Sequence, residues 1–138
     1  MTVRYAREAD LAFLRTLDGH VPERIRARNI AEKEIYILEE GGEKAGLLRC
    51  GLFWDSIPFC SLLYIVEGAR GRGFGSALVR HREGEMKSLG FGLAMTSTQA
   101  DEEGQHIWRK LGYRDCGGFL LPFPGYEQPL ELILAKGL

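Results

Sequence analysis

The chain has 138 residues, of which 45% are hydrophobic and 27% are charged, and its net charge at pH 7 is −1. This length fits a single domain, residues 1–138, that buries about two-thirds of its unfolded surface, and the near-zero charge excludes a general attraction to nucleic acid or to an anionic membrane. No apolar run approaches the ~18 residues that a membrane-spanning helix needs, and the first residues do not have the pattern of a signal peptide.

Three cysteines, Cys50, Cys60 and Cys116, are widely spaced along the chain. Their odd number and their spacing give neither a zinc-binding pattern nor an obvious set of disulfides. Because disulfides are rare in reducing compartments, we expect a cytoplasmic protein, and no metal is implied.

The first elements are predicted to be one short strand and two helices. Residues 3–5 form the strand, and the amphipathic segment 10–17 forms the first helix. Pro22 suits the first turn of a second helix over residues 23–31. We interpret the arginines of this second helix as a solvated charged face: Arg24, Arg26 and Arg28.

Three strands are predicted next. The segments 35–38 and 45–54 are joined by a hairpin turn at residues 40–43, because the paired glycines there supply the positive φ angles that such turns need. Pro58 is expected to separate the second strand from a third strand at residues 59–66.

The second half of the chain is predicted to alternate between helices and strands. A helix over residues 77–89 ends at Gly90, and a strand covers residues 93–98. The spacing of Thr98 and Asp101 resembles a capping box, which predicts a helix from there to Leu111. The helix over 77–89 is expected to bury one face, consisting of Phe74, Leu78, Met86 and Leu89. The last strands are expected at residues 113–121 and 130–135.

A glycine-rich segment lies between the third predicted strand and the helix over residues 77–89. It consists of Arg70, Gly71, Arg72, Gly73, Phe74, Gly75 and Ser76. The first turn of a helix has backbone N–H groups without internal partners and carries partial positive charge. Glycines remove the side chains that would keep a phosphate from this backbone, and the two arginines add positive charge. The segment therefore predicts an anion-binding site.

Two common glycine-rich loops do not fit this segment. A Walker-type loop ends in Gly-Lys-Ser/Thr, and the segment has no lysine. A dinucleotide-binding loop needs a third glycine where Ser76 stands and an acidic residue at the end of the next strand, and residues 94–98 contain none. A nucleotide-binding module that uses the loop for another phosphate is kept as a weaker alternative.

A third pattern, Arg/Gln-x-x-Gly-x-Gly/Ala, is matched by Arg70, Gly73 and Gly75. In this pattern the chain resembles the GNAT superfamily of acyl-CoA-dependent N-acyltransferases, whose pyrophosphate loop has that form. Residues 107–113, Ile-Trp-Arg-Lys-Leu-Gly-Tyr, also resemble the family pattern Phe-Tyr-x-Lys-Leu-Gly-Phe. Trp108 departs from the family because it stands where a tyrosine is usual.

The resemblance implies an α/β (α+β) fold. The family has a central mixed, mostly antiparallel sheet of about seven strands, splayed around the cofactor and flanked by about four helices. It also implies an enzyme that moves an acetyl group from acetyl-CoA to a primary amine of a small molecule or a protein, by direct attack on the thioester.

The resemblance further assigns roles to individual residues. In the family a bulge opens the strand before the glycine loop, so that backbone groups bind the pantetheine arm and face the acyl carbonyl. The matching positions are Tyr64, Ile65 and Val66. Asp101 falls where many family members have an asparagine near the cofactor.

Two residues are candidates for the chemistry. Glu67 follows the expected opening and is our first candidate for a base that deprotonates the amine, directly or through water; a solvated loop glutamate is the alternative. Trp108 cannot act as an acid at neutral pH, although its indole N–H can donate a hydrogen bond to the CoA thiolate.

Several alternatives stay open at this point. The missing tyrosine at Trp108 favours a degenerate domain that binds acyl-CoA as a sensor or interaction module, whereas the intact loop favours an enzyme. The sequence pattern does not identify the acceptor amine. It also leaves open whether the enzyme uses an acyl group other than acetyl. A homodimer that pairs the terminal strands is a further expectation, because exposed strand edges tend to associate.

Overall fold

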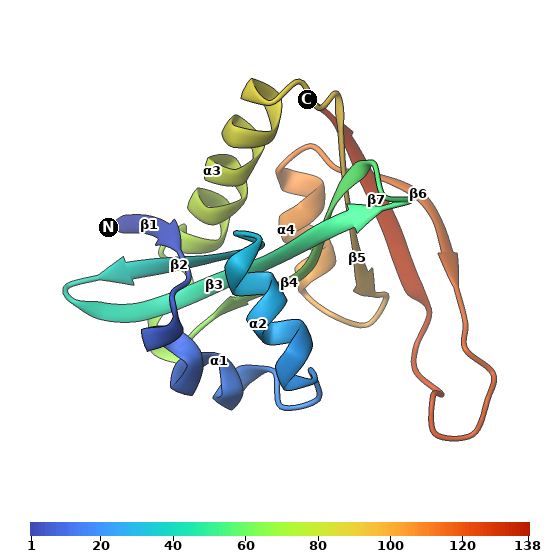
Figure 1. Ribbon diagram of the computed structural model, residues 1–138. Coiled ribbons are helices and arrows are strands. Elements are labelled where there is room, and N and C mark those ends of the chain that lie inside the picture. The colour runs from blue at the N-terminus through green and yellow to red at the C-terminus, as the bar shows by residue number, and fades with distance from the viewer. The chain divides into compact units, whose positions relative to one another are not determined.

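A computed structural model describes residues 1–138, and Figure 1 shows its helices and strands. In chain order the strands are β1 (Thr2–Tyr5), β2 (Ile35–Glu40), β3 (Glu43–Phe53), β4 (Ile57–Ile65), β5 (Leu93–Gln99), β6 (Arg114–Phe119) and β7 (Glu131–Gly137). The helices are α1 (Leu11–Leu17), α2 (Glu23–Ala31), α3 (Phe74–Ser88) and α4 (Gly104–Lys110), with short 3-10 helices η1 (Glu8–Asp10) and η2 (Glu67–Ala69).

The strands form a seven-stranded sheet in the order β1-β2-β3-β4-β5-β7-β6. β4 and β5 run parallel, whereas the pairs β1–β2, β2–β3, β5–β7 and β6–β7 run antiparallel. The expected mixed, mostly antiparallel sheet with four helices is therefore confirmed. No helix combines the length and the apolar character that a membrane crossing requires.

The chain forms two compact units, one from residues 1–50 and 62–81 and the other from residues 51–61 and 82–138. In the first unit, β2 and β3 form the expected hairpin, and both glycines of its turn have positive φ angles, 58° at Gly41 and 80° at Gly42. A core cluster of the first unit contains Ala6, Leu14, Ile35, Ile37 and Leu47.

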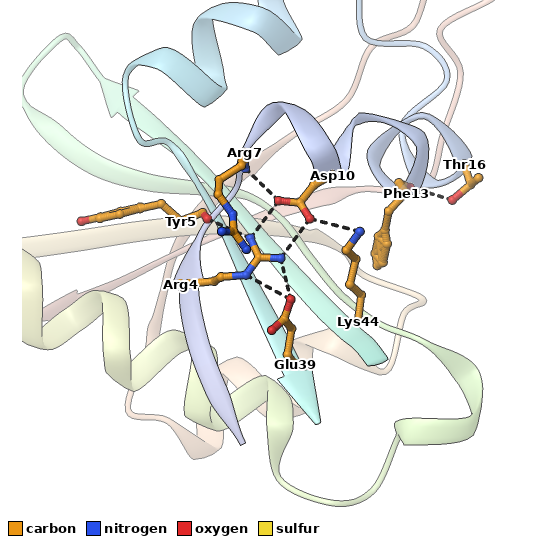
Figure 2. Close-up of polar contacts among 8 residues, drawn as sticks. All are labelled: Arg4, Tyr5, Arg7, Asp10, Phe13, Thr16, Glu39 and Lys44. Carbon is orange, nitrogen blue, oxygen red and sulfur yellow. Dashed lines mark hydrogen bonds and ion pairs between the residues drawn. The ribbon is translucent and has the colours of Figure 1, made fainter. Parts of the chain in front are cut away.

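A buried ion-pair cluster joins the start of the first unit to its hairpin (Figure 2). The carboxylate of Asp10 is 1% exposed and accepts hydrogen bonds from both terminal nitrogens of Arg4, at 2.8 and 3.0 Å. The backbone N–H of Arg7 and the Lys44 ammonium lie 2.7 and 3.1 Å from the same carboxylate. Arg4 also donates to Glu39 at 2.6 Å, so each charge in the cluster has an opposite partner.

In the second unit, β5 and β7 pair in antiparallel register over their whole length, and β6 pairs with the other side of β7. Figure 1 shows the long loop that joins β6 to β7, residues 120–130. Large apolar side chains are exposed along the end of β6 and this loop: Phe119, Leu120, Leu121, Phe123, Tyr126 and Leu130.

Four local expectations are wrong. Pro58 does not interrupt the chain but is buried inside β4, near the start of the strand, where the missing N–H is tolerated. Thr98 does not cap a helix, because it pairs with Leu132 within the sheet, and α4 begins only at Gly104. Leu89 is 70% exposed and lies outside the core face of α3.

The fourth wrong expectation concerns the arginines of α2. Arg26 is 3% exposed rather than solvated, and it donates to the backbone oxygen of Asp18 at 2.6 Å and to Glu23 at 2.7 Å. Burial of the guanidinium is tolerated because the Glu23 carboxylate compensates its charge and both acceptors satisfy its N–H groups. Arg24 and Arg28 are exposed, as expected.

Candidate cofactor-binding site

The glycine-rich loop connects η2 to the first residue of α3 within the first unit. Gly71 and Gly73 have φ angles of 76° and 82°, in the left-handed region where a residue with a Cβ atom is strained. A Cβ atom added at either position would meet nothing within 4 Å, so the space over both glycines is open. The loop therefore needs glycine for its backbone conformation and leaves its amides accessible to a ligand.

The N-terminus of α3 supplies the donors. Ala77 donates to the carbonyl oxygen of Gly73 at 3.0 Å, which is the first turn of a 15-residue helix. The N–H groups before Ala77 point out of the helix end and have no acceptor within it. Together with the helix dipole they attract an anion such as a pyrophosphate.

Two arginines flank these amides, and aromatic rings hold both of them. The Nε of Arg70 donates to the carbonyl oxygen of Ile65 at 2.9 Å, and its guanidinium lies 5.5 Å from the centre of the Tyr64 ring. The guanidinium of Arg72 lies 4.7 Å from the centre of the Phe74 ring. Both side chains are exposed and keep N–H donors for an incoming ligand.

Gly75 and Ser76 lie in the first turn of α3, and their surroundings differ from those of the loop glycines. A Cβ atom at Gly75 would lie 3.7 Å from Leu63 and 3.8 Å from Ile65, which is ordinary van der Waals contact. Gly75 therefore sits close over the end of β4, whereas Ser76 is half-buried in the same turn.

The end of β4 is held by a contact that the sequence patterns did not indicate. A Cβ atom at Gly46 of β3 would lie 2.6 Å from Cδ1 of Ile65 and 2.8 Å from the carbonyl oxygen of Tyr64. Val66 donates its N–H to the carbonyl oxygen of Ala45 at 2.9 Å. Gly46 thus lets the two strands approach closely, and a lone glycine between apolar residues of a strand is the only signal in the sequence for such a contact.

Glu67 is the first residue of η2, and its side chain is exposed. Its carbonyl oxygen accepts a hydrogen bond from the backbone N–H of Arg70 at 3.3 Å. The first unit thus contains Glu67, the expected backbone positions Tyr64 to Val66 and the glycine-rich loop. The expected bulge and the role of Glu67 as a base stay predictions.

Trp108 belongs to the second unit and is 5% exposed. The helix α4 ends in a Schellman motif, in which Tyr113 donates its N–H to the carbonyl oxygen of Trp108 and Gly112 donates to that of Arg109, both at 3.0 Å. This motif brings the ring of Tyr113 against that of Trp108. No residue accepts the indole N–H of Trp108, which leaves this donor available to a ligand.

Two neighbours of Trp108 in the sequence, His106 and Tyr113, are alternative candidates for protonating the thiolate, and they lie in different surroundings. Tyr113 is 4% exposed and donates its hydroxyl to Glu83 at 3.0 Å. Burial, and then the charge of Glu83, raises the pKa of Tyr113 above its usual range. The ring of His106 is exposed, with its Nε2 4.0 Å from Glu103. Asp101 is exposed in the turn between β5 and α4.

Comparison with known proteins connects this geometry to a family. A family model described as the acetyltransferase (GNAT) family matches residues 4–113. A search of curated proteins finds no match.

Solved structures share the fold at low sequence identity. Naa50 from Arabidopsis thaliana, in complex with the bisubstrate analogue CoA-Ac-MVNAL, superposes with a TM-score of 0.84 at 17% identity, covering 99% of this chain and 98% of that chain. The ribosomal-protein-alanine N-acetyltransferase from Brucella melitensis has a TM-score of 0.83 at 19% identity, with full coverage of both chains. A GNAT acetyltransferase from Elizabethkingia anophelis with acetyl-CoA bound has a TM-score of 0.77 at 14% identity, covering 99% and 97%. The chain belongs to the GNAT acetyltransferase family.

Proposed function

We propose that this protein transfers an acetyl group from acetyl-CoA to a primary amine. Membership of the family implies acyl transfer from an acyl-CoA. The observation that carries the proposal is the open loop at Gly71 and Gly73, which heads α3 and is flanked by Arg70 and Arg72. This arrangement of backbone donors and fixed positive charge suits the pyrophosphate of CoA.

The chemistry begins with the amine, which is mostly protonated at neutral pH because a lysine-like amine has a pKa of ~10.4. Glu67 takes one proton, directly or through water. The neutral nitrogen then attacks the thioester carbonyl and forms a C–N bond. The oxygen that becomes negative accepts a hydrogen bond from backbone N–H at Tyr64 to Val66.

Collapse of this intermediate breaks the C–S bond and releases the CoA thiolate, and the second proton of the attacking nitrogen passes to water. The indole N–H of Trp108, which has no acceptor in the protein, stabilises the thiolate by a hydrogen bond, and water protonates it. A thiol with a pKa near the ~8.5 of cysteine leaves partly without an acid, so this route supports a modest rate.

We propose the terminal amine of a peptide or protein as the first acceptor to test. Two of the similar structures are named for such substrates, a bisubstrate analogue that carries the peptide MVNAL and a ribosomal protein alanine. The exposed apolar side chains along the end of β6 and the loop of residues 120–130 support this choice, because they offer contacts to apolar peptide side chains.

Steady-state release of CoA from acetyl-CoA, measured with polyamines, free amino acids and short peptides, tests the proposal. Turnover with at least one primary amine, and mass spectrometry of the acetylated amine, is the expected result. Binding of acetyl-CoA without turnover across the panel would instead favour a non-catalytic acyl-CoA-binding module, which no structural observation favours.

A further inference from the structure

Arg82 occupies a position on α3 where an apolar side chain is expected. Phe74, Leu78 and Arg82 follow one another at intervals of four residues and therefore lie on one face of the helix. Their exposed fractions are 7%, 0% and 4%, so this face is buried along its length. The third position of a buried stripe thus carries a permanent positive charge, because arginine does not lose its proton in proteins.

The guanidinium of Arg82 has no partner within the protein. It makes no hydrogen bond or ion pair, and its Nε is fully enclosed without an acceptor. Arg26, the other buried arginine, is 3% exposed and has two acceptors within 2.7 Å. The protein therefore compensates one buried guanidinium and leaves the other uncompensated, although an unpaired buried cation is strongly destabilising.

The carboxylate next to Arg82 in the sequence, Glu83, already has two partners. It accepts the hydroxyl of Tyr113 at 3.0 Å and lies 3.0 Å from the ammonium of Lys136. The charge of Arg82 acts on the same Tyr113, where it opposes the rise in pKa that burial and Glu83 cause. Because Lys136 pairs with Glu83 and the hydroxyl of Tyr113 is neutral, this group contains no unpaired negative charge for Arg82.

We propose that Arg82 binds a small carboxylate beside the pair formed by Tyr113 and Glu83. One excess positive charge matches one carboxylate rather than a doubly charged phosphate. The enclosed Nε and its neighbouring terminal nitrogen form the fork that holds the two oxygens of a carboxylate side by side. Because the arginine is 4% exposed, the ligand that reaches it is small or is a terminal carboxylate of a larger molecule.

Thermal unfolding with sodium formate as the probe tests this site without any CoA. Formate is titrated into the parent protein, into Arg82→Leu, which restores an apolar stripe, and into Arg80→Gln, which removes an exposed charge from the same helix. We expect a saturable rise of the midpoint in the parent and in Arg80→Gln. Arg82→Leu is expected to weaken formate binding by at least about tenfold, the loss of a charge-assisted hydrogen bond.

The unfolding midpoints without formate give a second, independent readout. Arg82→Leu is expected to unfold at the same temperature as the parent or at a higher one, because it removes an unpaired buried cation. A much lower midpoint would show that the guanidinium already has a partner within the protein and would overturn the proposal. Equal formate-induced shifts of the unfolding midpoint in all three proteins would overturn the proposal as well, since the shift would then be a non-specific effect of salt.

Arg82→Lys distinguishes a carboxylate from a spherical anion. Lysine keeps the charge but lacks the fork, so formate binding is expected to weaken in this variant. An equal, saturable response of the parent and of Arg82→Lys to sodium chloride, with no preference for formate, would overturn the assignment to a carboxylate.

The source of the carboxylate is tested by comparing succinyl-CoA with acetyl-CoA in calorimetry, an arm that rests on the proposed function. Tighter binding of succinyl-CoA by the parent, lost in Arg82→Leu, assigns the carboxylate to the acyl group. Equal affinities for the two donors, together with a saturable formate response, assign it to a free carboxylate. The formate titration needs no CoA, so its result tests the Arg82 site even if the proposed acetyltransferase activity is refuted.

Discussion

The indole ring of Trp108 meets the ring of Tyr113 edge to face, with 4.9 Å between the ring centres and 74° between the planes. Neither ring is a ready source of a proton at neutral pH. The indole N–H is a donor but not an acid, and burial together with Glu83 makes Tyr113 hold its proton more firmly than usual. In our proposal Trp108 therefore stabilises the thiolate and does not protonate it.

The first prediction concerns the turnover number, kcat. Trp108→Tyr is expected to keep or raise kcat, because a phenol at this position adds an acid to the donor that is lost. His106→Ala and Tyr113→Phe are expected to change kcat by less than about tenfold, ~1.4 kcal/mol of barrier. Steady-state kinetics with acetyl-CoA measures all three. A loss of about a hundredfold or more in either of the last two, with acetyl-CoA affinity intact, would identify that residue as the acid.

The second prediction concerns the loop. Gly73→Glu puts a side chain and a negative charge into the open space over the loop, so calorimetry is expected to show no acetyl-CoA binding. Gly125→Glu is the matched control, because Gly125 has a similar φ of 84° and open surroundings. This control is expected to bind acetyl-CoA like the parent. Equal affinities of Gly73→Glu and the parent would refute the loop as the pyrophosphate site.

The third prediction concerns Arg70. Arg70→Ala is expected to weaken acetyl-CoA binding by about 1.5–3 kcal/mol, the worth of a charge-assisted hydrogen bond, and towards the lower value because the side chain is exposed. The parent's affinity is expected to fall with salt, and the fall is expected to be shallower in the variant. Arg114→Ala, an exposed arginine on β6, serves as the control. An unchanged dissociation constant would mean that Arg70 stays on the Ile65 carbonyl in the complex.

The fourth prediction is a pH dependence of stability that centres on Asp10 (Figure 2). The hydrogen bonds from Arg4 lower the pKa of Asp10 well below its usual 3.8. The ionised carboxylate therefore stabilises the folded state above about pH 4, and this contribution is lost as the pH falls towards the folded-state pKa. Asp10→Asn is expected to cost about 3 kcal/mol at neutral pH, because it removes the buried carboxylate that pairs with Arg4 and Lys44 and leaves Arg4 with Glu39 alone.

Chemical denaturation of the parent and of Asp10→Asn between pH 7 and about pH 2 checks this dependence. The difference between their free energies of unfolding is expected to be constant above about pH 4 and to shrink below it. Asp115→Asn breaks the exposed pair with Arg109 and is expected to have a much smaller effect. A difference that stays constant down to the lowest pH would contradict the assigned role of Asp10.

Sequence patterns predicted helices and turns correctly where residues adjacent in the sequence determine the backbone conformation. Helix α2 lies at residues 23–31 as expected, because Pro22 before it marks its start. The turn at Gly41 and Gly42 lies as expected because the pair supplies positive φ angles. The glycine loop was recognisable for the same reason, since a strand, glycines and a helix N-terminus are contiguous in sequence.

Patterns failed where a distant partner decides the environment. Thr98 has a good capping spacing, but its pairing with Leu132 keeps it in the sheet. Arg26 is as polar as its neighbours on α2, and only the acceptors at Asp18 and Glu23 make its burial tolerable. Gly46 in the candidate site could not be predicted for the same reason. Position 46 requires glycine because β4, which follows later in the chain, approaches it closely.

The last prediction tests that approach. Gly46→Ala places a methyl group 2.8 Å from the carbonyl oxygen of Tyr64 and 2.6 Å from Ile65, so the end of β4 must shift. Overpacking of this kind costs about 1–3 kcal/mol of stability, and acetyl-CoA affinity is expected to fall because the displaced backbone faces the cofactor in our proposal. Gly51→Ala on the same strand meets nothing within 4 Å and is expected to retain both properties. Denaturation and calorimetry on the two variants measure them. If Gly46→Ala lost stability but kept its affinity, the backbone of Tyr64 and Ile65 would support the strand without contacting acetyl-CoA.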